Sequence, residues 1–203
     1  MWIRDVIPKS LPGVRAILYG YESNLLGSKS FQSITDIAVT LIHHLKAGGW
    51  NFEDSKPLVF LAHSLGGIVL KSAVIEIANG RNNSVTSILD KIQGAIMFGV
   101  PNLGMEQGHL ATLVEGQANE MLVQDLSRGN GTQYLREQND QFGGICHLRR
   151  VRVFWAYETK LSPTLVVSSA LTNLYFIHGF NTRLTRISNE QMALGIGTDL
   201  RQC

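Results

Sequence analysis

The chain has few cysteines, and the two it has follow no metal-binding or disulfide pattern. Only Cys146 and Cys203 occur in 203 residues. A zinc site or a disulfide framework requires several cysteines at short, regular spacings. The sequence therefore predicts no metal site and no disulfide framework, and we expect no cofactor. The low cysteine content fits a reducing compartment.

Long hydrophobic runs are also missing, although 44% of the residues are hydrophobic. No apolar run reaches the roughly 18 residues that a membrane-spanning helix requires. The first residues, Met-Trp-Ile-Arg-Asp, lack the apolar centre of a signal peptide. From these absences we expect a soluble intracellular protein without a transmembrane segment, cytoplasmic by default.

Neither sign of charge is in marked excess. Eighteen Lys and Arg residues stand against 16 Asp and Glu residues, which gives a net charge of +2. This balance gives no reason to expect nucleic acid or an anionic surface as a partner. With 17% charged residues the composition is that of an ordinary globular protein, and 203 residues are enough for one domain with a sizeable core.

The stretch from Pro57 to Lys71 carries the strongest functional signal. Leu58 to Leu61 form a continuous apolar run, which is typical of a strand covered on both faces in a parallel sheet. After Gly67 the apolar residues recur at helical spacing instead. Ser64 is therefore predicted to lie between a buried strand and a helix. This is the arrangement of a nucleophile elbow, which exposes a strained serine.

Small residues flank Ser64, as an elbow requires. The strand and the helix approach closely there, so the positions two before and two after the serine must be small. Ala62 and Gly66 occupy these positions, and Gly67 gives further room. Ala62 stands where the usual pattern has glycine. The alternative interpretation is a glycine-rich turn between a strand and a helix, without chemistry.

The rest of the chain alternates between predicted strands and helices. This alternation predicts an α/β fold with a mostly parallel sheet and helices on both faces. A helix is expected to begin at the capping box of Ser33 and Asp36. Further strands are predicted at 14–19, 92–98 and 151–156, and a late helix near 133–142. In such sheets the site lies at the carboxyl ends of the strands, where Ser64, the segment 99–104 and Glu158 are expected to meet.

The segment Ala-His-Ser-Leu-Gly-Gly-Ile-Val-Leu-Lys resembles the elbow of lipase-like α/β-hydrolases related to the serine-active-site-containing (SERAC-type) proteins. More narrowly, it is similar to the hydrolase-like domains at the front of fungal NACHT- and ankyrin-repeat proteins. Phe-Gly-Val-Pro and Ala-Tyr-Glu-Thr-Lys follow in the order found in that group. The resemblance implies an α/β-hydrolase domain over 1–162 and an atypical tail over 163–203. It also implies hydrolysis of an ester or lipid-like small molecule, and a peripheral location at the mitochondrion or endoplasmic reticulum as the alternative to the cytoplasm.

The catalytic roles follow from the order of residues in this fold. A serine hydroxyl requires a base, and the base requires an acid that orients it; the chain order is serine, acid, histidine. Glu158, at the end of a predicted strand, suits the acid by position, although it can equally be a surface carboxylate paired with Lys160. His178 is the only histidine downstream of Glu158, but its surroundings do not match the family motif. The N–H of Leu65 is the expected oxyanion donor.

Two parts of the resembled fold have no counterpart in this sequence. In the resembled proteins a strand and a glycine-rich loop with the second oxyanion donor lie upstream of Trp2, and losing one donor costs about 10²–10³-fold in rate. We therefore expect a fold that is incomplete at both ends and a poor catalyst. Three interpretations stay open: a serine hydrolase, a non-catalytic signalling or interaction module with protein partners, and a shortened gene product. The apolar segment from Leu174 to Ile177 is expected at the sheet edge beyond 151–156; an unpacked tail and a central insertion are the alternatives.

Overall fold

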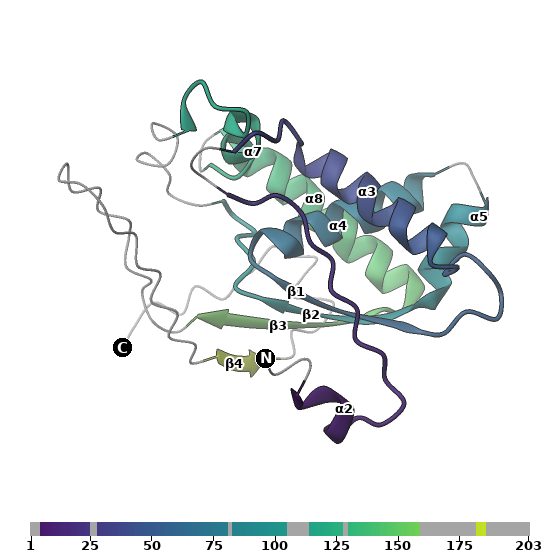
Figure 1. Cartoon of the computed structure of the whole chain (residues 1–203). Helices are drawn as coiled ribbons and strands as arrows, with labels where there is room; N and C mark the ends of the chain where they lie inside the picture. Colours follow the sequence, from purple (N-terminus) through teal and green to yellow (C-terminus); the bar gives the residue numbers. More distant parts are fainter. Residues whose placement is uncertain are drawn as a thin grey trace.

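Three parallel strands and one short antiparallel strand form a single sheet in the computed structural model of the chain (Figure 1). The strand order is β1-β2-β3-β4. The structure describes residues 5–24, 28–80, 83–104, 114–127, 130–158 and 182–185, with 130–132, 157–158 and 182–185 described in backbone only. The helices and the parallel strands are consistent with an α/β fold.

The elements follow one another in the order helix, helix, strand, helix, with the strands β1, β2 and β3 separated by helical segments. Their bounds are α2 (Ile7–Ser10), α3 (Ile34–Ala47), β1 (Leu58–His63), α4 (Leu65–Asn79), α5 (Asn83–Thr86), the 3₁₀ helix η1 (Ser87–Lys91), β2 (Ile92–Phe98), α7 (Glu120–Asp125), α8 (Asn130–Arg149), β3 (Arg152–Glu158) and β4 (Thr182–Thr185).

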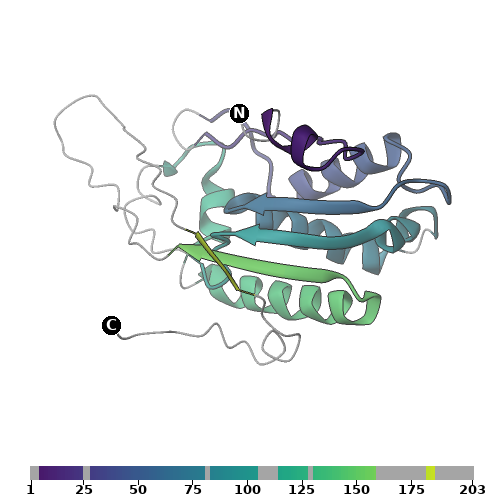
Figure 2. The ribbon, with the colours of Figure 1, turned by 90° about the horizontal axis from the view of Figure 1, so that it is seen from below.

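The long helices α3, α4 and α8 lie together on one face of the sheet (Figures 1 and 2). Helix α4 is the central one, since it packs against both α3 and α8, and residues around its whole circumference are buried. Helices were expected on both faces of the sheet. Among the described residues the long helices cover one face only, and the four-residue α2 lies on the other side in Figure 1. Apolar runs in the strands do not reveal where the covering helices go.

The predicted strand over 14–19 is also wrong. Residues 13–24 adopt neither helix nor strand. The Val14 N–H donates to the Leu11 carbonyl of the preceding turn, and no described strand pairs with the segment. The Tyr19 hydroxyl instead donates to the Ile37 carbonyl of α3 at 2.8 Å, while Ile17 and Leu18 are exposed. A β-forming sequence becomes a strand only when a neighbouring strand pairs with it, and the described part of the chain supplies none here.

Other local predictions are closer to the structure. Ser33 caps α3 as predicted: its hydroxyl accepts the Asp36 N–H, and the Asp36 carboxylate accepts the Ser33 N–H at 2.9 Å. The late helix expected near 133–142 is α8, which is longer than predicted at 20 residues. The segment Leu174 to Ile177 and the boundary between 162 and 163 lie outside the described residues. The strand found at the edge beyond β3 is β4.

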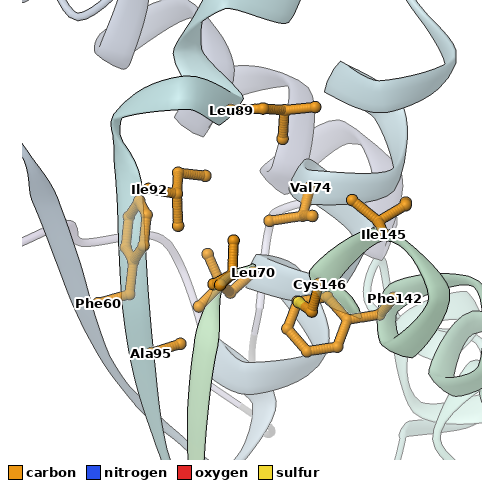
Figure 3. A pocket seen from close by; sticks show the side chains of 10 residues that line it. Phe60, Leu70, Val74, Leu89, Ile92, Ala95, Phe142, Ile145 and Cys146 are labelled. Carbon is orange, nitrogen blue, oxygen red and sulfur yellow. The ribbon is translucent and has the colours of Figure 1, made fainter. Parts of the chain in front are cut away.

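The core lies between the sheet and the helices on the covered face. The core contains a small apolar gap lined by side chains from both layers (Figure 3). The lining residues are Phe60, Leu70, Val74, Leu89, Ile92, Ala95, Phe142, Ile145, Cys146 and Val151. Burial raises the pKa of the Cys146 thiol to about 12. The gap has no polar lining, so it is a dry space in the core rather than a ligand site.

Candidate active site

Ser64 connects β1 to α4 in a strained backbone conformation. Its φ is 49° and its ψ is −124°, a combination that residues with a side chain rarely adopt. Strand β1 ends at His63, runs parallel to β2, and α4 begins at Leu65. The predicted strand, strained serine and helix are confirmed at the predicted positions.

Two backbone hydrogen bonds hold Ser64 in place. Its N–H donates to the Phe98 carbonyl at the end of β2, at 2.9 Å, and its carbonyl accepts the N–H of Gly67 at 3.0 Å. The first bond joins the serine to the neighbouring strand, and the second closes the first turn of α4. The serine itself is half-buried.

The space around the elbow is tightest at Gly67. A Cβ atom at Gly67 would lie 2.2 Å from Cγ2 of Val100, whereas a Cβ at Gly66 would lie 3.6 Å from the Tyr21 hydroxyl oxygen, an ordinary contact. Ala62, the next-to-last residue of β1, is buried. The sequence predicted that Ala62 and Gly66 must be small, but the structure places the strongest steric requirement at Gly67.

Leu65 is the first residue of α4. The first N–H groups of a helix have no acceptor within the helix, and no described backbone carbonyl accepts the N–H of Leu65. The positive end of the helix dipole adds to the attraction of this N–H for negative charge. These features suit an oxyanion donor, and that role stays a prediction.

Glu158 ends β3 on the same edge of the sheet as Ser64. His63 pairs with Phe98, and Phe98 pairs with Ala156, two residues before Glu158. The backbone of Glu158 thus reaches the carboxyl rim, where β4 pairs with it through Thr182. His178 lies outside the described residues, so the predicted triad of Ser64, Glu158 and His178 stays a prediction.

Four histidines lie within the described residues: His43, His44, His63 and His147. His63 alternates with the buried Ala62, so its side chain is on the face of the sheet opposite the helices and is exposed. His44, in α3, packs edge-on against the Tyr19 ring with the ring centres 5.8 Å apart. His43 is exposed in α3 and His147 is exposed in α8.

Lys71 is a feature of this region that the sequence reasoning missed. Its side chain is fully buried. The ammonium Nζ donates to the Asn102 Oδ1 at 2.6 Å and more weakly to the Asn139 Oδ1 at 3.4 Å. It also lies 5.9 Å from the centre of the Trp155 ring. Burial lowers the pKa of Lys71 to about 7.

A signal for this lysine was present in the sequence. Lys71 follows Ile68 by three positions and precedes Ile75 by four, so it occupies the same apolar stripe of α4. A charged residue inside such a stripe indicates a buried polar contact, because lysine is almost never fully buried without a partner.

The described residues hold no group of three or more His, Cys, Asp or Glu side chains that could bind a metal ion. None of the described helices is long and apolar enough to cross a membrane. A larger, open surface pocket lies at the end of α3, lined by His43, Lys46, Ala47, Asn51 and Phe52. Neither this pocket nor the apolar gap of Figure 3 includes Ser64.

Comparison with known proteins gives one distant relative. The chain is 25% identical over 115 residues to Protein SERAC1 of Bos taurus. The match covers 54% of this chain and 16% of the relative, so the chain spans well under two thirds of that protein. No family model and no solved structure matches the chain. The similarity is consistent with a distant family relation, and these comparisons give no support to the resemblance to fungal NACHT-associated domains.

Proposed function

We propose that this chain is a serine hydrolase-like domain of the lipase or esterase type, in which Ser64 attacks a carboxylic ester. The observation that carries the proposal is the backbone of Ser64, with φ 49° and ψ −124°, between a parallel strand and a buried helix. A strained serine at such a junction is typical of a nucleophile elbow. The distant similarity to Protein SERAC1 supports a hydrolase-like class.

The proposed reaction proceeds in two steps. The Ser64 Oγ attacks the ester carbonyl carbon while a histidine accepts the serine proton; the alcohol then leaves with that proton and the acyl group stays on Oγ. Water releases the acid in the second step. We assign His178 as the base, Glu158 as the acid that orients it, and the Leu65 N–H as a donor to the oxyanion.

Labelling with a fluorophosphonate probe tests this proposal, because the reagent reacts with an activated serine whatever the natural ester is. We expect the label on the tryptic peptide from Ala47 to Lys71, because trypsin does not cleave between Lys56 and Pro57, and Ser64→Ala should abolish it. Ser72→Ala is the matched control, since Ser72 lies on the same helix but is buried in the core. This control should keep the label.

The partners of Ser64 are tested with the same probe. We expect His178→Ala and Glu158→Ala to slow labelling by about 10²-fold or more, because each removes a member of the proposed triad. A folded chain whose Ser64 takes no label would overturn the proposal. The alternative of a non-catalytic signalling or interaction module would then replace it.

A further inference from the structure

The buried amine of Lys71 occupies a position where an apolar side chain would be expected. The groups that face it come from three elements: Asn102 from the loop after β2, Asn139 from α8, and Trp155 from β3. No described carboxylate lies within ion-pair distance of the amine. Burying an unpaired ammonium destabilises a fold, so core packing alone does not account for lysine at this position.

The nearest contact of Lys71 is with the loop that runs beside Ser64. The Asn102 oxygen accepts from the amine at 2.6 Å. The loop from Gly99 to Gly104 is itself compact, since the Asn102 N–H donates to the Val100 carbonyl and the Gly104 N–H donates to the Pro101 carbonyl. Lys71 thus holds a small folded loop rather than a single side chain.

Three residues contact this loop and the strand end before it: Ser64, which is the N-cap of α4, and Gly67 and Lys71 within the helix. Ser64 donates to the Phe98 carbonyl, Gly67 leaves room for the side chain of Val100, and Lys71 donates to Asn102. The spacings of three and four residues place Ser64, Gly67 and Lys71 on one side of the helix. Their partners, 98, 100 and 102, are alternate residues of the loop and the strand end.

We infer that Lys71 is a positioning residue for Ser64. The hydrogen bond from Lys71 to Asn102, which we call the latch, holds the loop 99–104 against α4. The held loop in turn fixes the end of β2, where the Phe98 carbonyl accepts the Ser64 N–H. This inference rests on the proposed function where it concerns reactivity, but the latch itself is a property of the folded chain. Both acceptors are amide oxygens, and a neutral amine also donates hydrogen bonds, so the latch does not depend on the charge of Lys71.

Amide hydrogen exchange of the full chain tests the latch without any substrate. In Lys71→Met and in Asn102→Leu, we expect the amides of Ser64, Asn102 and Gly104 to exchange roughly ten to a hundred times faster, because each variant leaves a buried polar group without its hydrogen-bond partner. Amides in the middle of α3 report global unfolding and should not accelerate. Asn139→Leu is the matched control, because it removes the longer contact, at 3.4 Å, and spares the loop.

Asn102→Asp provides the rescue, because a carboxylate oxygen still accepts from Lys71. We expect this variant to keep slow exchange in the loop, and fluorophosphonate labelling of Ser64 to stay near the rate of the unchanged protein. Labelling should slow about tenfold or more in Lys71→Met and Asn102→Leu, in step with the faster exchange. If Lys71 only fills space in the core, the result is different: Lys71→Met then leaves the hydrogen-exchange rates of the loop amides unchanged.

The two proposals fail separately. If Ser64 never takes the label but loop exchange accelerates as described, the hydrolase proposal is wrong and the latch stands. If Ser64 is labelled at equal rates in the unchanged protein, Lys71→Met and Asn102→Leu, and the loop amides exchange equally, Lys71 is not a positioning residue.

Discussion

Two rows of side chains, one residue apart on the same three strands, have very different surroundings. Ala62, Met97 and Trp155 are paired neighbours and are buried against the helices. Leu61, Ile96 and Phe154 form the next row on the opposite face. Leu61 is 45% exposed there, whereas Met97 is 0% exposed. The exposed row, Leu, Ile and Phe, contains only hydrocarbon side chains, so the difference does not come from polar side chains in that row.

The difference shows that the apolar sequence of a strand indicates which faces can be buried. It does not indicate which faces are covered by other elements. A strand buried on both faces and a strand buried on one face can share the same continuous apolar run. Here α3, α4 and α8 gather on one face (Figure 2), so one row joins the core and the other does not. The free energy of unfolding should therefore respond very unequally to truncation of the two rows.

The largest expected effect is in the covered row. Met97→Ala removes a fully buried side chain, and a cavity of this kind typically costs about 2–5 kcal/mol of unfolding free energy. Urea denaturation followed by circular dichroism measures this loss.

Leu61→Ala is the matched variant on the opposite row, and we expect it to cost less than about 1 kcal/mol because much of that side chain is already in water. Equal losses for Met97→Ala and Leu61→Ala would break the comparison. They would mean that both faces of the strands are covered in solution.

The second prediction concerns Lys71, the one buried lysine among the described residues. Burial lowers its pKa from 10.5 to about 7, so the unfolded chain binds this proton more tightly than the folded chain does. The contribution of Lys71 to stability is therefore fully present only above the unfolded pKa, and it is lost as the pH falls through the folded pKa. Between about pH 7 and pH 9 the unfolding free energy should rise by about 2 kcal/mol.

Lys71→Met provides the control for this prediction, because methionine fills similar space and does not titrate. The rise attributed to Lys71 should be absent in this variant over the same pH range. Burial raises the pKa of Cys146 to about 12, which lowers stability above about pH 9, so the comparison stops there. If the unfolding free energy changes with pH in the same way in the unchanged protein and in Lys71→Met, the amine is solvated and the prediction is wrong.

The elbow could be predicted from sequence because its signals are local. A short apolar run, a serine between small residues and a change to helical spacing all lie within Pro57 to Lys71. The conformation of Ser64 depends on this strand and helix, and on the adjacent end of β2. The capping box of α3 was predictable for the same reason, since Ser33 and Asp36 contact each other directly.

Features that depend on distant partners were not predictable in the same way. The segment 14–19 has a β-forming sequence, but its structure depends on whether another strand pairs with it. Lys71 contacts residues 31 and 68 positions away in the chain. The position of the long helices α3, α4 and α8 on one face likewise follows from tertiary packing rather than from any one segment.

The smallest expected effect concerns the packing of α4 against Val100 next to Ser64. Gly67→Ala would place a Cβ 2.2 Å from Cγ2 of Val100, so the Val100 side chain must turn or α4 must shift. We expect a loss of about 1 kcal/mol, at the low end for over-packing, because alanine also favours the helix over glycine. Gly66→Ala is the matched control: its Cβ would meet only the Tyr21 hydroxyl, at 3.6 Å, and stability should be unchanged or slightly higher. Thermal unfolding of both variants measures the difference in stability. If Gly66→Ala is the less stable of the two, the tight contact is at Gly66 and not at Gly67, and the prediction is wrong.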